Sequence, residues 1–269
     1  MDFLNKSVMS VYYKHYNMNK NLLKFSFLVI LYYGMITFTC FAQQTQRIVN
    51  NQTQSWISLN TSARFSNKWG MVGDLHYRAN QIFANPNFYF VRAGVNYWLK
   101  DNITLTLGYA HMWLAPTTVG WYTYSNENRI YEQVQMSSKI GSISMVQRLR
   151  NEQRWQEKIV KDTSTHTNKF TDRIRYLLSF TIPISKNTYY PSIVLSDELS
   201  VQTGKEVVYN VFDQNRAFIG IKQMINKRLS FDLGYMLVDQ EKANGYNFDQ
   251  NHTFRWFFYY TPDLRTKKS

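Results

Sequence analysis

The sequence predicts an all-β protein, a single antiparallel transmembrane β-barrel of about 12 strands, with ten strands as the alternative. Apolar residues recur at every second position through most of the chain after residue 42. The alternating segments are about 10 to 14 residues long, which is enough for a tilted strand to cross a bilayer. Short and long connections alternate between them, as they do at the two ends of a membrane barrel.

The first predicted strand shows the pattern clearly. Ile57 and Leu59 are apolar, whereas Ser58 and Asn60 are polar. Successive side chains of a strand point to opposite faces, so this strand has one apolar and one polar face. The same period continues through eleven segments, which are 57–65, 69–78, 89–97, 103–109, 130–138, 142–155, 170–182, 188–202, 215–224, 229–240 and 252–260.

A twelfth strand is expected because bacterial single-chain barrels have an even number of strands, which places both chain ends on the periplasmic side. The candidate is the segment QTQRIVNN, residues 44–51. The short connections are SNK, KD, the turn near Gly141, PISKN and INKR. The long connections are 80–87, 114–128, 156–169, 203–214 and 241–250.

Aromatic side chains lie near the ends of the predicted strands, in phase with the apolar face. They are Trp69, Tyr77, Tyr89, Tyr97, Tyr109, Trp155, Tyr235 and Tyr260. Aromatic residues also fill soluble cores. As a set in one phase, they match the girdles that flank the apolar band of a membrane barrel.

The N-terminal 42 residues differ from the rest of the chain. Lys20 and Lys24 precede the apolar run FSFLVILYYGMITF, and TCFAQQ follows it. A basic start, a short apolar segment and a small residue before a polar stretch predict a secretory signal peptide over residues 1–42, with cleavage after Ala42. The mature chain is then residues 43–269, and its predicted location is the outer membrane of a Gram-negative bacterium.

Other interpretations of this segment stay open. Met18 offers a second start, which would place residues 1–17 upstream of the true start codon. An uncleaved transmembrane anchor is one alternative, although the apolar run is shorter than the roughly 20 residues of a membrane-spanning helix. A lipoprotein attached at Cys40 is another, although the preceding TFT lacks the small residue expected before a lipidated cysteine.

The segment RLRNEQRW, residues 148–155, carries a charge at every second position. A soluble protein would not bury such a row on the core face of a strand. In a membrane barrel the polar phase faces the lumen, so the row is predicted to line it. Later strands add charges in the same phase, and the predicted lumen charge network is Arg148, Arg150, Glu152, Arg154, Arg173, Arg175, Glu198 and Arg216.

Two interpretations of this network are open. The charges either pack against one another in a closed interior, or they line a pore or ligand site. Only Glu152 and Asp172 are expected beside the arginines of 148–175, and Asp172 is in the opposite phase, so a local positive excess is predicted. Large side chains in the polar phase could narrow a pore: Phe88, Phe90, Trp98, Phe257 and Tyr259.

The chain resembles an uncharacterised domain-of-unknown-function family of Gram-negative outer-membrane barrels. The matching pieces are SWISLNTSARFSNKWGMVGDLHYR, ENRIYEQVQ, RLRNEQRW, LSDELSV, FDQNRAFIGI and LSFDLGYM, which span most of 52–260. The resemblance implies a barrel in the outer membrane and no particular activity. It also implies that Asn215 lies on the polar face. The segment SDEL departs from the Asn-Glu pair typical of that family, which leaves the role of Asp197 open.

Enzyme and nucleic-acid functions are not expected. His111 lies beside the long connection 114–128, where a lipid hydrolase would need a histidine, but the sequence shows no serine paired with it. No cofactor fingerprint or metal-binding motif is present. The net charge is +13, and residues 1–42 hold four Lys and one Asp, so 43–269 keep +10. These charges alternate along strands and do not cluster as nucleic-acid patches do.

The expected function is therefore a small anion-favouring channel or transporter. The alternative is a closed structural barrel whose long loops bind a partner or lipid, and a lipid-modifying hydrolase is the weakest candidate. Basic residues such as Lys158, Lys161 and Lys169 suit the phosphates of lipopolysaccharide. The predicted partners are outer-membrane lipid, lipopolysaccharide and small anionic solutes.

Overall fold

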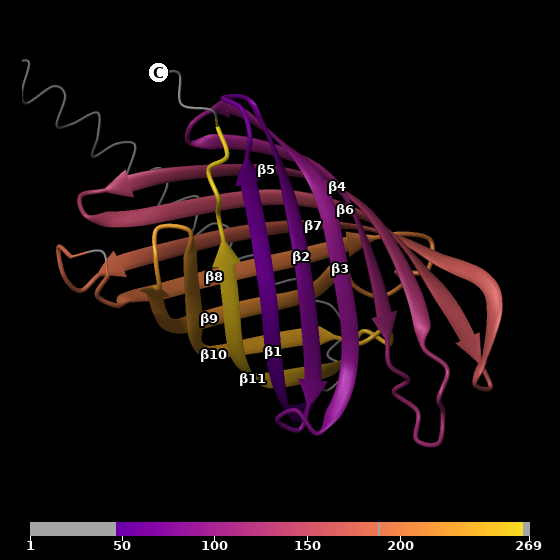
Figure 1. Cartoon of the computed structure of the whole chain (residues 1–269). Coiled ribbons are helices and arrows are strands. Elements are labelled where there is room, and N and C mark those ends of the chain that lie inside the picture. The colour runs from indigo at the N-terminus through magenta and orange to yellow at the C-terminus, as the bar shows by residue number, and fades with distance from the viewer. Residues whose placement is uncertain (1–46, 188, 266–269) are drawn as a thin grey trace, which may run out of the picture. The chain divides into compact units, whose positions relative to one another are not determined.

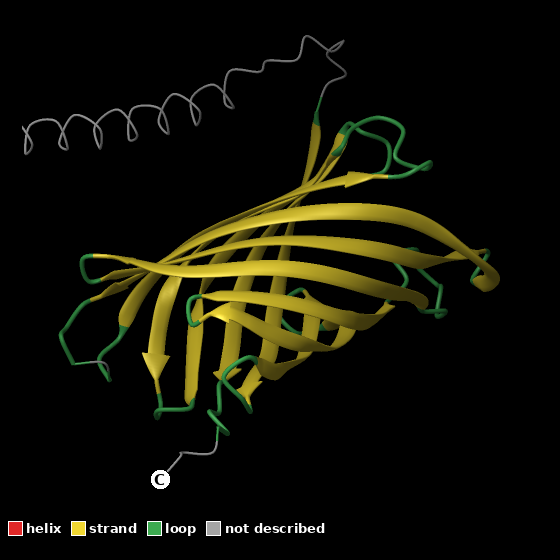
Figure 2. Ribbon diagram, turned by 90° about the horizontal axis from the view of Figure 1, so that it is seen from above, coloured by secondary structure: helices red, strands yellow, loops and turns green. Residues whose placement is uncertain are grey.

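The computed structural model describes residues 47–187 and 189–265, and the signal peptide predicted over 1–42 lies outside them. The described residues form eleven strands around one closed barrel and contain no helix that could cross a membrane (Figures 1 and 2). The strands are β1 (Ile48–Arg64), β2 (Trp69–Asn80), β3 (Asn85–Lys100), β4 (Ile103–Leu114), β5 (Ser125–Ile140), β6 (Ile143–Val160), β7 (Thr163–Pro183), β8 (Ser192–Thr203), β9 (Phe212–Met224), β10 (Leu229–Glu241) and β11 (Asn247–Tyr260).

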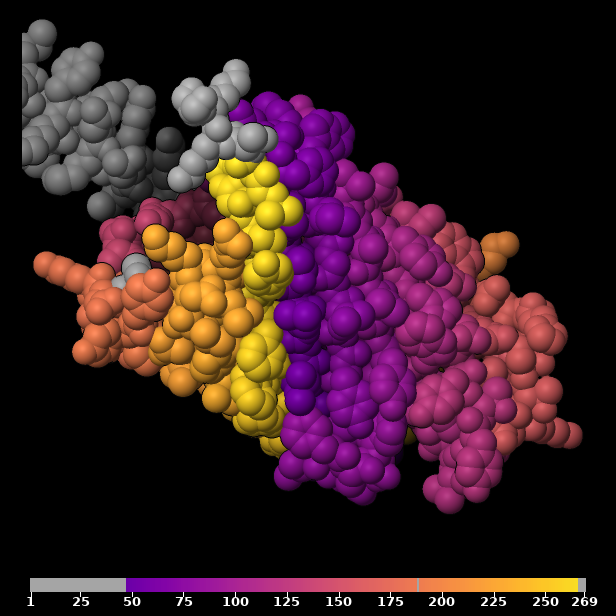
Figure 3. All heavy atoms as spheres, in the orientation of Figure 1, coloured from indigo at the N-terminus to yellow at the C-terminus, as the bar shows by residue number. Residues whose placement is uncertain are grey.

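The strand number corrects the prediction of twelve, and also its alternative of ten. Residues 48–51 of the candidate twelfth strand form the beginning of β1. Consecutive strands run antiparallel, so with an odd number the first and last strands point the same way. β1 and β11 accordingly pair in parallel, from Ile48 opposite Asn247 to Thr61 opposite Tyr260. Figure 3 shows this seam, where β11 in yellow lies along β1 in indigo.

The parallel seam places the start of β1 and the end of β11 at opposite ends of the barrel, so the expectation that both lie on one side is wrong. We name the two ends by their connections. The turn end carries 65–68, 101–102, 141–142, 184–191, 225–228 and the segment after Tyr260. The loop end carries 81–84, 115–124, 161–162, 204–211 and 242–246.

The connection predicted at 156–169 is a hairpin instead of a long loop. β6 and β7 stay paired to Val160 opposite Thr163, and only Lys161 and Asp162 make the turn. Both have positive φ, 49° and 59°, as a two-residue type I′ hairpin turn requires. Beyond Gln156 and Asp172 the hairpin pairs with no other described strand, and none of its residues 157–170 is fully buried. A strand without a buried face has no apolar period, which is why the sequence pattern stopped there.

The two faces of the barrel wall have opposite character. Large apolar side chains point outward and are exposed along most strands; they include Leu59, Met71, Leu75, Val95, Leu107, Leu149, Ile174, Leu195, Leu199 and Ile219. The interior is mainly polar, with buried Asp, Glu, Arg, Asn, Gln, Ser and Thr side chains. One apolar cluster also lies inside, made of Trp56, Val194, Phe218, Met236 and Val238. This is the reverse of a soluble protein, where the apolar face is buried.

Two pairs of inward-facing glycines bring neighbouring strands and an aromatic ring close together. Gly94 lies opposite Gly108, and the ring of Tyr131 from the next strand occupies the space above Gly108. Gly220 lies opposite Gly234, beneath the ring of Phe218. A methyl group on Gly108 would lie 2.5 Å from the Tyr131 ring. Each pair therefore needs glycine for close approach.

We predict that Gly234→Ala destabilises the barrel by about 1–3 kcal/mol, because the new methyl group would overlap the carbonyl oxygen of Ile219 and the Cα of Gly220. The matched control is Gly73→Ala, where the nearest heavy atom to the new methyl group is 3.9 Å away. Its stability should stay within about 0.5 kcal/mol of wild type. Denaturant unfolding in detergent, followed by tryptophan fluorescence, measures both. Equal losses in the two variants would contradict the proposed overlap.

Candidate functional site

The row of charges in RLRNEQRW lies on the inner face of β6. Its register with β7 sets Arg150 directly opposite Arg175 and Glu152 opposite Arg173. On the next pair of strands, Glu198 of β8 lies opposite Arg216 of β9. Alternation along each strand and pairing between strands thus bring all eight residues of the predicted lumen charge network to the interior of the barrel, seven of them in ion pairs with one another.

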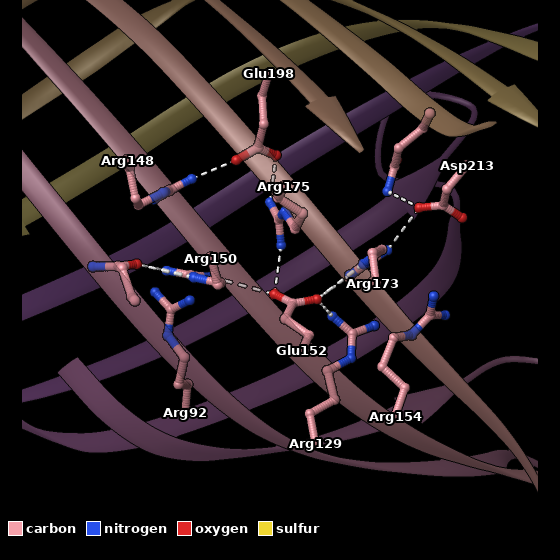
Figure 4. A network of polar contacts seen from close by, with 12 residues as sticks. Arg92, Arg129, Arg148, Arg150, Glu152, Arg154, Arg173, Arg175, Glu198 and Asp213 are labelled. Atoms are coloured by element: carbon pink, nitrogen blue, oxygen red, sulfur yellow. Dashed lines mark hydrogen bonds and ion pairs between the residues drawn. The ribbon is translucent and has the colours of Figure 1, made fainter. Parts of the chain in front are cut away.

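Glu152 is the centre of this network (Figure 4). Arg173 donates to its Oε2 from Nε at 3.0 Å, and Arg175 donates to Oε1 from Nη1 at 2.7 Å. Arg129 reaches Oε2 at 3.2 Å, and Arg150 reaches Oε1 at 3.5 Å. Four guanidinium groups from β5, β6 and β7 therefore surround one carboxylate that is 3% exposed.

Glu198 forms a second centre beside the first. Arg148 and Arg175 each donate to one of its carboxylate oxygens, and Arg216 Nη1 lies 3.2 Å from Oε1. Arg175 contacts both Glu152 and Glu198, so it joins the two centres. Charge-assisted contacts of this kind satisfy buried oxygens on several sides at once and hold neighbouring strands in register.

Two carboxylates of the network were missed by the sequence analysis. Glu127 accepts from Arg129 and Arg154, so Arg154, the eighth predicted residue, is neutralised here. Asp213 lies 3.0 Å from Arg173 Nη1. The expectation that only Glu152 and Asp172 lie near these arginines is therefore wrong.

The reason for missing Asp213 is a β-bulge. Ser200 pairs with Gln214 but Val201 pairs with Phe212, which leaves Asp213 as the extra residue of β9. Asn215, expected on the polar face, lies instead in the outward phase, where its side chain donates to exposed Asp197. Strict alternation from inward-facing Arg216 would also turn Asp213 outward, whereas the bulge turns it into the barrel. Glu127 was missed for a simpler reason, because β5 begins at Ser125, inside the predicted long connection 114–128. Asp172 lies in the outward phase, opposite Gln153.

A cavity of about 1000 Å³ lies inside the barrel. Its lining reaches Asp101 and Thr261 at the turn end and Thr118 and Trp121 at the loop end, so it extends along the whole barrel. The cationic side chains in its wall are Arg78, Arg92, Arg129, Arg148, Arg150, Arg154, Arg173, Arg175, Arg216, Lys222 and Arg255. The carboxylates are Asp74, Asp101, Glu127, Glu157, Glu198, Asp213 and Asp232, and Glu152 touches four of the arginines. Eleven cations against eight carboxylates leave an excess of three positive charges.

The large aromatic side chains of the polar phase line the same cavity, as predicted from the sequence; they are Phe88, Phe90, Trp98, Phe257 and Tyr259. Smaller ion pairs lie among them. Arg92 is paired with Asp74, and Arg255 Nη2 lies 2.8 Å from Asp232. These contacts are on β2, β3, β10 and β11, so charged groups occur on both sides of the seam.

The histidine considered for a hydrolase has other partners. His111 Nδ1 lies 2.8 Å from Asn128 Oδ1, and the His111 ring packs against Trp113. Among the described side chains it makes no hydrogen bond to a serine. The described part of the chain also holds no group of three His, Asp or Glu side chains placed to bind a metal ion.

We predict that Glu152→Gln destabilises the barrel by about 3 kcal/mol or more, because four arginines lose their shared negative charge in a buried site. The matched control is Glu132→Gln on β5, whose exposed side chain accepts from Gln153 on the outer face. That change should cost less than about 1 kcal/mol. Denaturant titration in detergent micelles compares the two. A Glu152→Gln variant as stable as Glu132→Gln would show that the network is not held by this carboxylate.

Comparison with known proteins gives a family. The family described as "Protein of unknown function (DUF2490)" matches residues 53–251. The match covers the whole barrel sequence except the first residues of β1 and the last residues of β11. No curated protein and no solved structure matches the chain. The expected relationship to an uncharacterised domain family is thereby confirmed, while the outer-membrane character of that family stays a prediction. The chain belongs to the DUF2490 family of proteins of unknown function.

Proposed function

We propose that this protein is an outer-membrane channel that passes small anions through the lumen of its barrel. The observation that carries the proposal is the cavity of about 1000 Å³ that extends from the turn end to the loop end with an excess of positive charge in its wall. A charged wall in a narrow low-dielectric tube focuses the electric field and raises the local concentration of counter-ions. The proposal includes export by the signal peptide at 1–42.

The outer surface supports a membrane location. Trp69 packs on Tyr97 near the turn end at a ring distance of 4.8 Å, and Tyr77 packs near Tyr89 toward the loop end at 5.4 Å. Trp69 and Tyr77 are eight positions apart on β2, roughly 27 Å along the strand. Exposed Met71 and Leu75 lie between them. Two aromatic groups separated by apolar residues match the girdles that flank the apolar band of a membrane barrel.

A closed barrel is the second candidate, and one observation favours it. The buried cluster of Trp56, Val194, Phe218, Met236 and Val238 fills part of the interior with apolar groups. In that case the ion pairs would serve packing, and the exposed hairpin and loops at the loop end would bind lipopolysaccharide or a partner. Lys158 on this hairpin is paired with Glu206 at 2.7 Å, so Lys161 and Lys169 are the better candidates for phosphate contacts.

The location has a direct test. We predict that the protein is recovered in the outer-membrane fraction, and that heated and unheated samples migrate differently in detergent gels because a closed barrel resists unfolding. Recovery as a soluble periplasmic protein would contradict both the channel and the closed membrane barrel.

Selectivity tests the channel. We predict anion-selective conductance in planar bilayers, measured as the reversal potential in a salt gradient, with selectivity falling toward 1 M salt, where the Debye length is about 3 Å. Lys222→Glu should shift the reversal potential toward cations, because Lys222 lines the cavity. Lys222 is preferred over Arg150 and Arg173, which hold Glu152 and whose reversal would disrupt the network.

Lys227→Glu is the matched control, because it makes the same charge change on the exposed connection 225–228 and outside the cavity lining. Its reversal potential should equal that of wild type. A cation-selective wild type, or a Lys222→Glu variant that behaves as the control does, would reject the anion path. Absence of conductance would favour the closed barrel.

A further inference from the structure

Arg78 differs from every other arginine of the cavity wall. Among residues 47–187 and 189–265, each of the others forms an ion pair with a carboxylate; they are Arg92, Arg129, Arg148, Arg150, Arg154, Arg173, Arg175, Arg216 and Arg255. Arg78 lines the same cavity and makes no ion pair with any described residue. Its Nε is buried and has no hydrogen-bond partner among the described residues.

Aromatic rings flank Arg78 instead of carboxylates. The register places Arg78 of β2 between Trp56 of β1 and Phe88 of β3, all on the inner face. The Cζ of Arg78 lies 3.3 Å from the centre of the Trp56 ring and 4.4 Å from that of Phe88. Rings that stack on a guanidinium group cover its faces and leave the N–H groups at its edge available, and this edge matches the oxygens of a carboxylate or phosphate.

Further donors lie beside Arg78. His76 is two positions away on the same face of β2, and neither of its ring nitrogens has a described hydrogen-bond partner. Arg216 approaches the Trp56 ring at 5.1 Å, so one ring lies near two guanidinium groups. His76, Arg78 and Arg216 all line the cavity. An unpaired guanidinium away from bulk water needs a compensating negative charge.

We propose that Arg78, together with His76 and Arg216, forms a binding site inside the barrel for the oxyanion group of a small solute, either a carboxylate or a phosphate. The flanking Trp56 and Phe88 hold the guanidinium edge toward the cavity. This site adds a binding step to the proposed channel function. It rests on that function for access of the solute along the lumen, since an anion that crosses the barrel would pass these side chains. Binding itself does not require conduction.

Direct binding measurements on the purified full-length barrel in detergent test the site. The probes are inorganic phosphate and acetate, each titrated at constant ionic strength against chloride. Calorimetry should detect saturable binding of at least one probe to wild type, and the stronger probe identifies the oxyanion. Arg78→Gln should weaken that binding about tenfold or more, because charged hydrogen bonds to the anion are lost. Arg78→Lys should recover only part of it, because the ammonium group lacks the planar fork.

Folding of the variants provides a separate readout. Arg78→Gln leaves no carboxylate unpaired and removes only the contacts with Trp56 and Phe88. In chloride buffer it should therefore fold and lose far less resistance to denaturant than Glu152→Gln. Lys227→Gln on the exposed connection 225–228 is the control and should bind the probe as wild type does. Equal binding by wild type and a folded Arg78→Gln would overturn the site, and so would no saturable binding of either probe. Binding by a barrel that shows no conductance would reject the channel and support the site. Anion conductance without binding would support the channel and reject the site.

Discussion

The contact of Glu152 with four arginines is the interaction on which the interior depends. A barrel with apolar residues outside must place its charges inside, where each unpaired charge costs several kcal/mol. Glu152 receives donors from β5, β6 and β7 at one point, and Arg175 connects it to Glu198 on β8. The shared carboxylates let arginines stand side by side on neighbouring strands, which their mutual repulsion would otherwise oppose.

The same network explains how one interior can be both packed and hollow. On the side of β5 to β9, carboxylates and guanidinium groups form ion pairs with one another. On the side of β1 to β3, aromatic rings take the place of carboxylates beside Arg78. Some polar groups of the wall are therefore available to bind whatever occupies the cavity. Positive charges outnumber negative charges in this wall.

The sequence predicted the features that follow from the alternation of polar and apolar residues along a strand. It missed the features that arise where this alternation is interrupted. The period of two was sufficient to place the eight network residues on the inner face and to find the aromatic residues that share the cavity. Asp213 could not be found in this way, because a bulge adds one residue and reverses its direction. The hairpin around Lys161 and Asp162 has no fully buried side chain over residues 157–170, so its strands carry no clear apolar pattern. The period of two marked eleven strand segments. The parallel pairing of β1 with β11 leaves no signal in the local sequence, so a general preference for even numbers of strands suggested a twelfth strand.

The parallel seam also limits how the chain could be reconnected. In an even-stranded barrel the first and last strands end beside each other, and a short loop can join them in a circular permutant. Here Ile48 and Tyr260 lie at opposite ends of a seam of 14 residue pairs, roughly 45 Å at the rise of a strand. A linker between them would have to run through the cavity or across the apolar outer face. Tags joined at these two points would accordingly emerge at opposite ends of the barrel.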